Sequence, residues 1–412
     1  MKKTTLIILL ITSGILFASC TKPRTDRNIQ PNPPSGDTIL TPGLNNQMVY
    51  AASADGNLYA FDAQNGTIKW TFRLNNSGVW TDMGSSPAYY DSVIYVGSSD
   101  QNIYAVNAFT GKEVWRYQTN STYGFFYSSP VVANGTVYIA GFEPKFYALD
   151  AKSGQLKWSR DFPRDFQSSP AYYNNTIFIT SNDGVLYAID AGTGNQLWAQ
   201  GSAVGGGVDY SQNSPCVKDG VVYAIADVNN LFIANPVMNE LSVVDGTSNQ
   251  GLYSTFYFPA ATHFFSCPTI DDSIVYVGGS DSILYAVKNG ERMYYNLMWK
   301  FKAGGIIAGS PVCDDSLVYT TTFNGVVYAV DKRDGIQKWI FDTYLGNTGI
   351  QTSTVVANGV VFFGSTDRFW ALNAKTGKLM WETNPPMPFF ASPVVLAKDG
   401  KAYHAGISGM QN

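Results

Sequence analysis

Few side chains of this sequence have the types and spacing that catalysis or metal binding requires. The two histidines, His263 and His404, share no spacing of the His-Glu-x-x-His kind that holds zinc or positions a general base. Asp82, Asp165 and Asp209 could supply oxygen ligands to calcium, but isolated carboxylates in polar loops are usually just solvated. We therefore expect no catalytic residue and no metal site, with calcium as the less favoured alternative.

Three cysteines, Cys216, Cys267 and Cys313, lie close to prolines that open short strands in successive parts of the chain. No two are adjacent, and no Cys-x-x-Cys-His segment occurs, which excludes covalently attached c-type haem. We expect these cysteines to be small buried apolar residues that lie near one another. A Cys216–Cys267 disulfide, formed in an oxidising compartment, is the alternative.

The N-terminus resembles a bacterial lipoprotein signal. A positively charged start, the apolar run Leu6–Phe17 and two small residues precede Cys20. The apolar run is too short to cross a bilayer, where about 20 residues are needed. We predict a signal peptide at residues 1–19, lipid attachment at Cys20, and a polar, proline-rich flexible tether at residues 20–39. A plain secretory signal with an incidental cysteine is the alternative.

A repeated unit organises residues 40–412. Its spacing, Ala-x-Asp-x-x-x-Gly-x-x-x-Trp, is seen in Ala188–Trp198. The Asp or Asn opens a turn, the Gly supplies a positive φ, and the next strand carries the Trp. Since each indole can bury about 150–250 Å², we expect these residues to hold neighbouring units together. They are Trp70, Trp115, Trp158, Trp198, Trp299, Trp339 and Trp381.

A second period is marked by a Ser-Pro that opens a short strand, and its copies lie 39 to 53 residues apart. Each unit then holds four short strands joined by tight turns, which is typical of a β-propeller blade. Eight full copies predict an all-β, eight-bladed β-propeller of four-stranded antiparallel blades, with seven blades as the alternative. A ninth, partial copy at Pro393–Ile407 should complete the first blade and close the ring.

These motifs, together with Ser-Ser-Pro-Val-Val and Gly-x-Leu-Tyr-Ala, resemble the PQQ-like repeat family of propellers over nearly all of residues 40–408. The family has two main branches. Quinoprotein dehydrogenases hold pyrroloquinoline quinone (PQQ) and Ca²⁺ over the propeller axis, whereas non-catalytic lipoproteins include the propeller subunit of the outer-membrane β-barrel assembly machinery. Many of the dehydrogenases pack their cofactor against adjacent, disulfide-linked cysteines, and this sequence has no adjacent cysteines. The repeat copies are also short, so they leave no long loops that could cover an active site. The resemblance therefore favours the non-catalytic branch, without a cofactor.

The composition excludes a nucleic-acid partner. The net charge is −4, and loss of Lys2 and Lys3 with the signal peptide makes it more negative. We therefore expect a monomeric, lipid-anchored scaffold that binds a protein partner in the cell envelope, with a role in outer-membrane protein assembly, on the periplasmic face of the outer membrane. A PQQ-dependent quinoprotein oxidoreductase and a glycan-binding lipoprotein are the alternatives.

Two departures from the repeat are candidate places for function. The fifth unit has Val243 where alignment expects the Trp, followed by an extended tail, Asp245–Ala261. An apolar residue four positions before the opening Pro recurs in nearly every copy, and it either packs between blades or forms a binding surface. These residues are Met83, Phe126, Phe166, Phe264, Ile307, Ile350 and Phe389. Neighbouring aromatics are our candidate partner-binding residues: Trp80, Phe125, Tyr127 and Tyr210.

Overall fold

We analysed a computed structural model, whose described part contains thirty-three β-strands and no helix. The candidates Cys20, Trp80, Phe125 and Tyr210 and the proposed tether lie outside this part. The described residues are 47–74, 85–119, 126–141, 143–200, 213–218, 220–227, 230–234, 256–257, 266–289, 295–346, 349–350, 352–383, 388–397 and 401–404.

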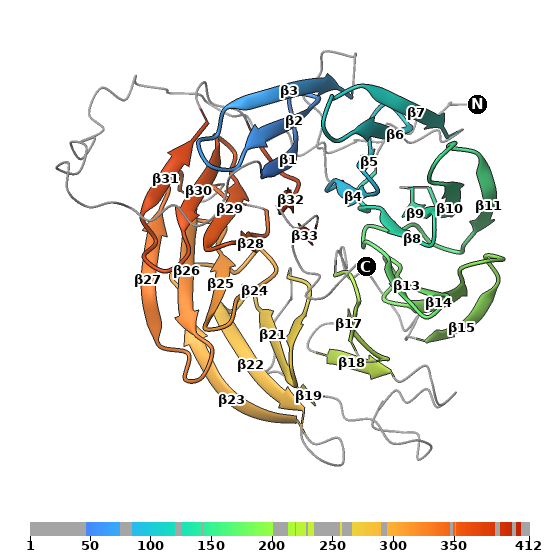
Figure 1. Cartoon of the computed structure of the whole chain (residues 1–412). Coiled ribbons are helices and arrows are strands. Elements are labelled where there is room, and N and C mark those ends of the chain that lie inside the picture. Colours follow the sequence, from blue (N-terminus) through green and yellow to red (C-terminus); the bar gives the residue numbers. More distant parts are fainter. Residues whose placement is uncertain are drawn as a thin grey trace, which may run out of the picture. The chain divides into compact units, whose positions relative to one another are not determined.

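The strands form eight antiparallel sheets, which confirms the predicted eight-bladed propeller (Figure 1). We number them as blades in chain order, and the strands within each are a, b, c and d from the centre outward. Blade 1 contains β1 (Met48–Ser53), β2 (Asn57–Asp62), β3 (Ile68–Arg73), β32 (Val394–Leu396) and β33 (Ala402–His404). Blade 2 contains β4 (Ala88–Tyr90), β5 (Val93–Gly97), β6 (Asn102–Asn107) and β7 (Glu113–Gln118). Blade 3 contains β8 (Val131–Ala133), β9 (Thr136–Ala140), β10 (Lys145–Asp150) and β11 (Leu156–Asp161).

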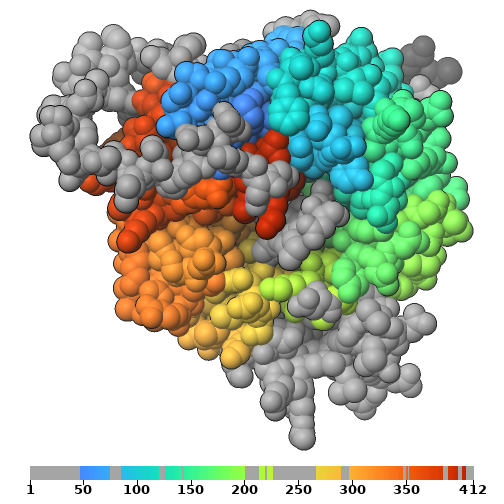
Figure 2. Space-filling view, viewed as in Figure 1, coloured from blue at the N-terminus to red at the C-terminus, as the bar shows by residue number. Residues whose placement is uncertain are grey.

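The remaining blades follow in the same order, as the colours show in Figure 2. Blade 4 contains β12 (Ala171–Tyr173), β13 (Thr176–Thr180), β14 (Leu186–Asp190) and β15 (Gln196–Gln200). Blade 5 contains β16 (Cys216–Lys218), β17 (Val221–Asp227), β18 (Asn230–Ala234) and β19 (Phe256–Tyr257). Blade 6 contains β20 (Thr269–Asp271), β21 (Ile274–Gly278), β22 (Ile283–Asn289) and β23 (Tyr295–Lys302). Blade 7 contains β24 (Val312–Cys313), β25 (Leu317–Thr321), β26 (Val326–Asp331) and β27 (Gln337–Asp342). Blade 8 contains β28 (Val355–Ala357), β29 (Val360–Gly364), β30 (Phe369–Asn373) and β31 (Leu379–Glu382).

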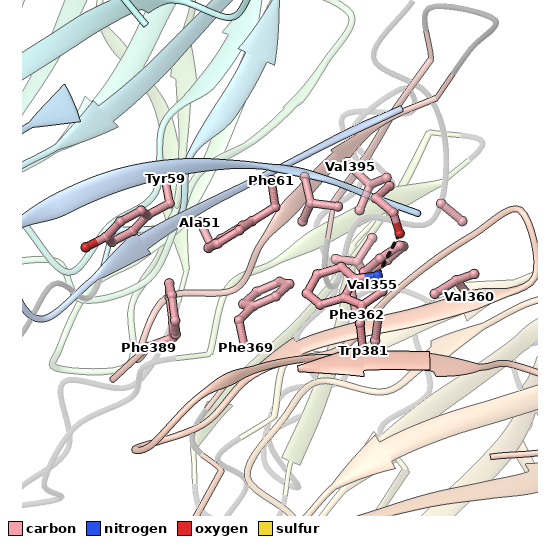
Figure 3. Packing of buried hydrophobic residues seen from close by; sticks show 14 residues of the cluster. Ala51, Tyr59, Phe61, Val355, Val360, Phe362, Phe369, Trp381, Phe389 and Val395 are labelled. Carbon is pink, nitrogen blue, oxygen red and sulfur yellow. Dashed lines mark hydrogen bonds between the residues drawn. The ribbon is translucent and has the colours of Figure 1, made fainter. Parts of the chain in front are cut away.

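The hydrophobic core lies between blades. Each buried cluster takes its side chains from two neighbouring sheets, so each blade depends on its neighbours for burial. Figure 3 shows the contact between blades 8 and 1, where Phe61 stacks on Phe369 with ring centroids 5.4 Å apart. Trp381 lies in the same cluster and donates its indole N–H to the carbonyl of Ala63, at 2.9 Å.

The same contact is repeated around the ring. The indole N–H donates to a backbone carbonyl of the next blade from Trp70, Trp115, Trp158, Trp299, Trp339 and Trp381. The repeat glycine of that next blade lies against the indole face, where an added Cβ would come within 2.5 to 2.7 Å of a ring atom. The glycine thus serves two purposes, because its φ is also positive, for example +69° at Gly377.

The Ser-Pro motif closes an inner ring. In each blade the residue before strand a donates its backbone N–H to the side chain of the equivalent residue in the next blade, at 2.8 to 3.1 Å. The eighth bond, from Ser392 to Ser86, returns to the start of the cycle. This inner ring consists of Ser86, Ser129, Ser169, Ser214, Cys267, Ser310, Ser353 and Ser392.

The ring closes through blade 1, which is built from both parts of the chain. β32 pairs with β1 in the place of strand a, and β33 adds a fifth strand on its inner side. The partial ninth copy therefore supplies the innermost strands of the first blade (Figure 1). His404, at the end of β33, thus lies on the strand inward of β32, which takes the place of strand a in blade 1.

Strand d of blade 5 lies at Phe256–Tyr257, within the segment Asp245–Ala261 that we expected to form an extended tail. Leu231 on β18 pairs with Phe256, just as Leu58 on β2 pairs with Phe72, which comes two residues after Trp70. Val243, the expected position of the missing Trp, lies outside the described residues. The extra residues interrupt the c-to-d connection, at 235–255, rather than following strand d.

Candidate functional site

The connections from strand d to strand a were expected to carry the partner site. The apolar residues that precede the Ser-Pro motif are fully or almost fully buried wherever the structure describes them: Phe126, Phe166, Ile307, Ile350 and Phe389. Three of them fill the space beside a glycine at the end of a strand b, since a Cβ on Gly97 would lie 2.6 Å from Phe126, one on Gly278 2.2 Å from Ile307 and one on Gly364 2.4 Å from Phe389. These residues therefore pack between blades, and Met83 and Phe264 lie outside the described part.

Of the four candidate partner-binding aromatics, the structure describes Tyr127 alone, and its side chain is half-buried. The same set of connections presents another aromatic that the sequence analysis missed. Tyr344, in the connection from blade 7 to blade 8, is 74% exposed. Its φ is +58°, which is unusual for a bulky residue, and its N–H donates to the Asp342 carboxylate at 2.7 Å. Neither the strand pattern nor the repeat marks this residue.

The centre of the ring encloses a cavity of about 410 Å³. Its walls are the inner ring, the residues of strand a that follow it, and His404 from β33. The structure thus brings together side chains that are far apart in the sequence, among them Lys218 of blade 5 and His404 of blade 1. Sequence spacing could not predict that these residues line one cavity, because only closure of the ring brings them together.

The thiols near this cavity are all free: Cys216, Cys267 and Cys313. Cys267 takes a serine's place in the inner ring and accepts the Ser214 N–H through its sulfur. Burial raises the pKa of the Cys216 thiol, and it raises that of Cys313 to about 12. Both thiols are therefore protonated at neutral pH and poorly nucleophilic.

Within the described residues, no group of three or more His, Cys, Asp or Glu side chains has the arrangement of a metal site. The same part of the chain has no helix with the length and hydropathy needed to cross a membrane.

Seven four-stranded blades and one five-stranded blade, six described Trp contacts between neighbouring blades and an inner ring of seven serines and one cysteine define an eight-bladed propeller of the PQQ-like repeat class. Sequence comparison identifies the family within this class. The family described as "Outer membrane protein assembly factor BamB" matches residues 19–142, 121–237 and 261–401, which together make up most of the chain. The chain belongs to this family.

Solved structures share the fold. The crystal structure of BamB from Moraxella catarrhalis matches with a TM-score of 0.60 and 18% identity, over 79% of this chain and 91% of that one. The computationally designed protein Ika8 matches with a TM-score of 0.61 and 14% identity, over 83% and 93% of the two chains. No curated protein sequence matches this chain. Because a designed protein has the same fold, these structural matches bear on architecture and not on function.

Proposed function

We propose that this protein is a non-catalytic, lipid-anchored scaffold that binds a protein partner during outer-membrane protein assembly. Membership of the BamB family, over most of the chain, is the observation that supports this role. The repeat residues agree with it, because the Trp, Gly and Ser of each unit hold blades together and leave function to the connections.

The anchor is the lipid on Cys20, and it holds the protein at the periplasmic face of the outer membrane. The polar, proline-rich segment 20–39 supports the lipid anchor, since it contains little to bury and can serve as a flexible tether between the lipid and the propeller. The propeller acts as a monomer and requires neither PQQ nor calcium. Replacement of Cys20 by serine should move the protein from the membrane fraction to the soluble periplasmic fraction, and unchanged sedimentation with membranes would contradict the anchor.

The partner site lies on the face formed by the d-to-a connections. Trp80, Phe125, Tyr127 and Tyr210 belong to these connections in sequence. Tyr344 adds an aromatic whose exposure is described. Tyr and Trp are over-represented among residues whose truncation costs an interface about 2 kcal/mol or more, so such a face suits protein recognition.

A photo-cross-linking amino acid at position 344, in intact cells, tests this role. The control carries the same amino acid at exposed Lys378, in a c-to-d turn at the opposite end of a blade. We expect capture of an outer-membrane protein assembly component from position 344 and not from position 378. Equal capture from both positions, or capture of no such component from position 344, would contradict the proposal.

A further inference from the structure

The central cavity is separate from the partner face and has its own chemistry. Seven of the eight inner-ring residues are serines, and each hydroxyl oxygen accepts a backbone N–H from the neighbouring blade. Accepting that bond leaves the hydroxyl hydrogen to be donated elsewhere. None of these seven hydroxyls donates to an acceptor within the described residues, and all seven line the cavity. The inner ring can therefore offer hydroxyl hydrogens to a ligand in the cavity.

The charged residues around the cavity favour a negatively charged ligand. No Asp or Glu is among the described residues that line the cavity, although the chain carries a net charge of −4. Lys218 lines the cavity and makes no ion pair within the described part. A nearby carboxylate, Asp271, is already paired with Lys332. One ammonium group in a partly buried space, with no ion-pair partner in the described part of the chain, favours a ligand of negative charge.

His404 adds a polar group that has no partner of its own. Its Nε2 is buried and makes no hydrogen bond, and the residue lines the cavity. Burial lowers the pKa of His404 to about 4, so the imidazole is neutral at neutral pH. A buried polar atom without a partner costs free energy, which a ligand that bonds to it would recover.

We propose that the central cavity binds a small oxyanion, a carboxylate or a phosphate, through Lys218, the inner-ring hydroxyls and His404. The volume of about 410 Å³ lies within the range usual for small-molecule sites. This site is distinct from the scaffold role, because its ligand groups are Lys218, the inner-ring hydroxyls and His404 rather than the aromatic side chains of the connections. Loss of anion binding would leave partner capture unchanged.

Isothermal titration of the purified full-length protein with inorganic phosphate and with citrate, in chloride at constant ionic strength, tests the proposal. We expect saturable one-to-one binding of at least one of the two, and the stronger binder distinguishes a phosphate site from a carboxylate site. Glucose serves as an uncharged control that offers hydroxyl groups alone. Saturable binding of glucose with no response to either anion would overturn the proposal in favour of a sugar site.

Two lysine variants locate the site. Lys218→Gln should weaken binding at least about tenfold, because it removes the charge of the cavity. Lys378→Gln, which removes an exposed charge far along the chain, should leave the affinity unchanged. The His404 ring signal in NMR gives a second readout, since the bound anion should raise the pKa of His404. Absence of saturable binding, or equal affinity of Lys218→Gln and the parent, would overturn the proposal.

Discussion

The contact between each repeat glycine and the indole of the preceding blade makes a quantitative prediction. At Gly377, φ is +69° and an added Cβ would lie 2.7 Å from Cδ2 and Cε3 of Trp339. At Gly135, φ is +67° but no described atom lies within 4 Å of that position. Alanine in either place is forced into a left-handed conformation, at a cost of about 1–2 kcal/mol. Only Gly377→Ala also places a methyl group too close to Trp339 in the contact between two blades, which adds about 1–3 kcal/mol to the cost.

Urea denaturation followed by circular dichroism measures the two costs. We expect the free energy of unfolding to fall by about 1–2 kcal/mol for Gly135→Ala and by about 2–5 kcal/mol for Gly377→Ala. In a Trp339→Leu background the cost of Gly377→Ala should shrink to that of Gly135→Ala, since the indole is no longer in the way. Equal costs for the two glycine variants, or a cost at Gly377 that persists without Trp339, would refute this account of the seam.

Three further predictions concern the inner ring, its cavity and the cofactor. Cys267→Ser should raise the free energy of unfolding by about 0.5–1 kcal/mol, because a hydroxyl accepts the Ser214 N–H better than a thiol does; a lower urea midpoint would contradict this. His404 has a folded-state pKa of about 4 against roughly 6.5 when unfolded, so its contribution to stability is complete above pH 6.5 and is lost as the pH falls toward 4. The stability profile of His404→Gln should be flatter across that window, and an unchanged slope would count against burial of the ring. Finally, the purified protein should neither bind PQQ stoichiometrically nor reduce a dye with alcohols or sugars in the presence of Ca²⁺, and turnover would favour the dehydrogenase branch.

Much of the fold could be predicted because each repeat residue acts locally. The Asp or Asn, the Gly and the Trp of one unit specify a hairpin between strands c and d, and their period gives the number of blades. The Ser-Pro motif marked the start of strand a. The hydrogen-bond partner of this motif could not be predicted, however, because it is the same motif in the next blade, and only the closed ring brings the two together.

Blade 5 shows where the repeat pattern stops being informative. Counting along the sequence placed the Trp position at Val243 with an extended tail after it, whereas the structure has strand d at Phe256–Tyr257, where Leu231 pairs with Phe256. Register is set by hydrogen bonds between strands, and an inserted loop changes the count without changing the pairing.

The candidate site was less predictable than the fold. Lys218 and His404 lie in one cavity only because eight blades close and β33 turns inward, and neither residue stands in a local motif. Tyr344 was missed for a different reason. It lies exposed in a turn with a positive φ, and the sequence does not indicate such a turn because tyrosine rarely adopts a positive φ. For the apolar residues of the same connections, the interpretation as packing between blades is confirmed where the structure describes them, because they are buried.

The scaffold role is tested most directly by partner capture with a doubly substituted protein. Trp80→Ala combined with Tyr127→Ala removes two aromatics of the d-to-a connections and leaves the Trp residues between the blades in place. Cross-linking in intact cells should show loss of the outer-membrane assembly component, while the variant keeps nearly the parent melting temperature. Undiminished capture of that component by a normally folded variant would contradict the placement of the partner site, and failure of the parent protein to capture it would contradict the role itself.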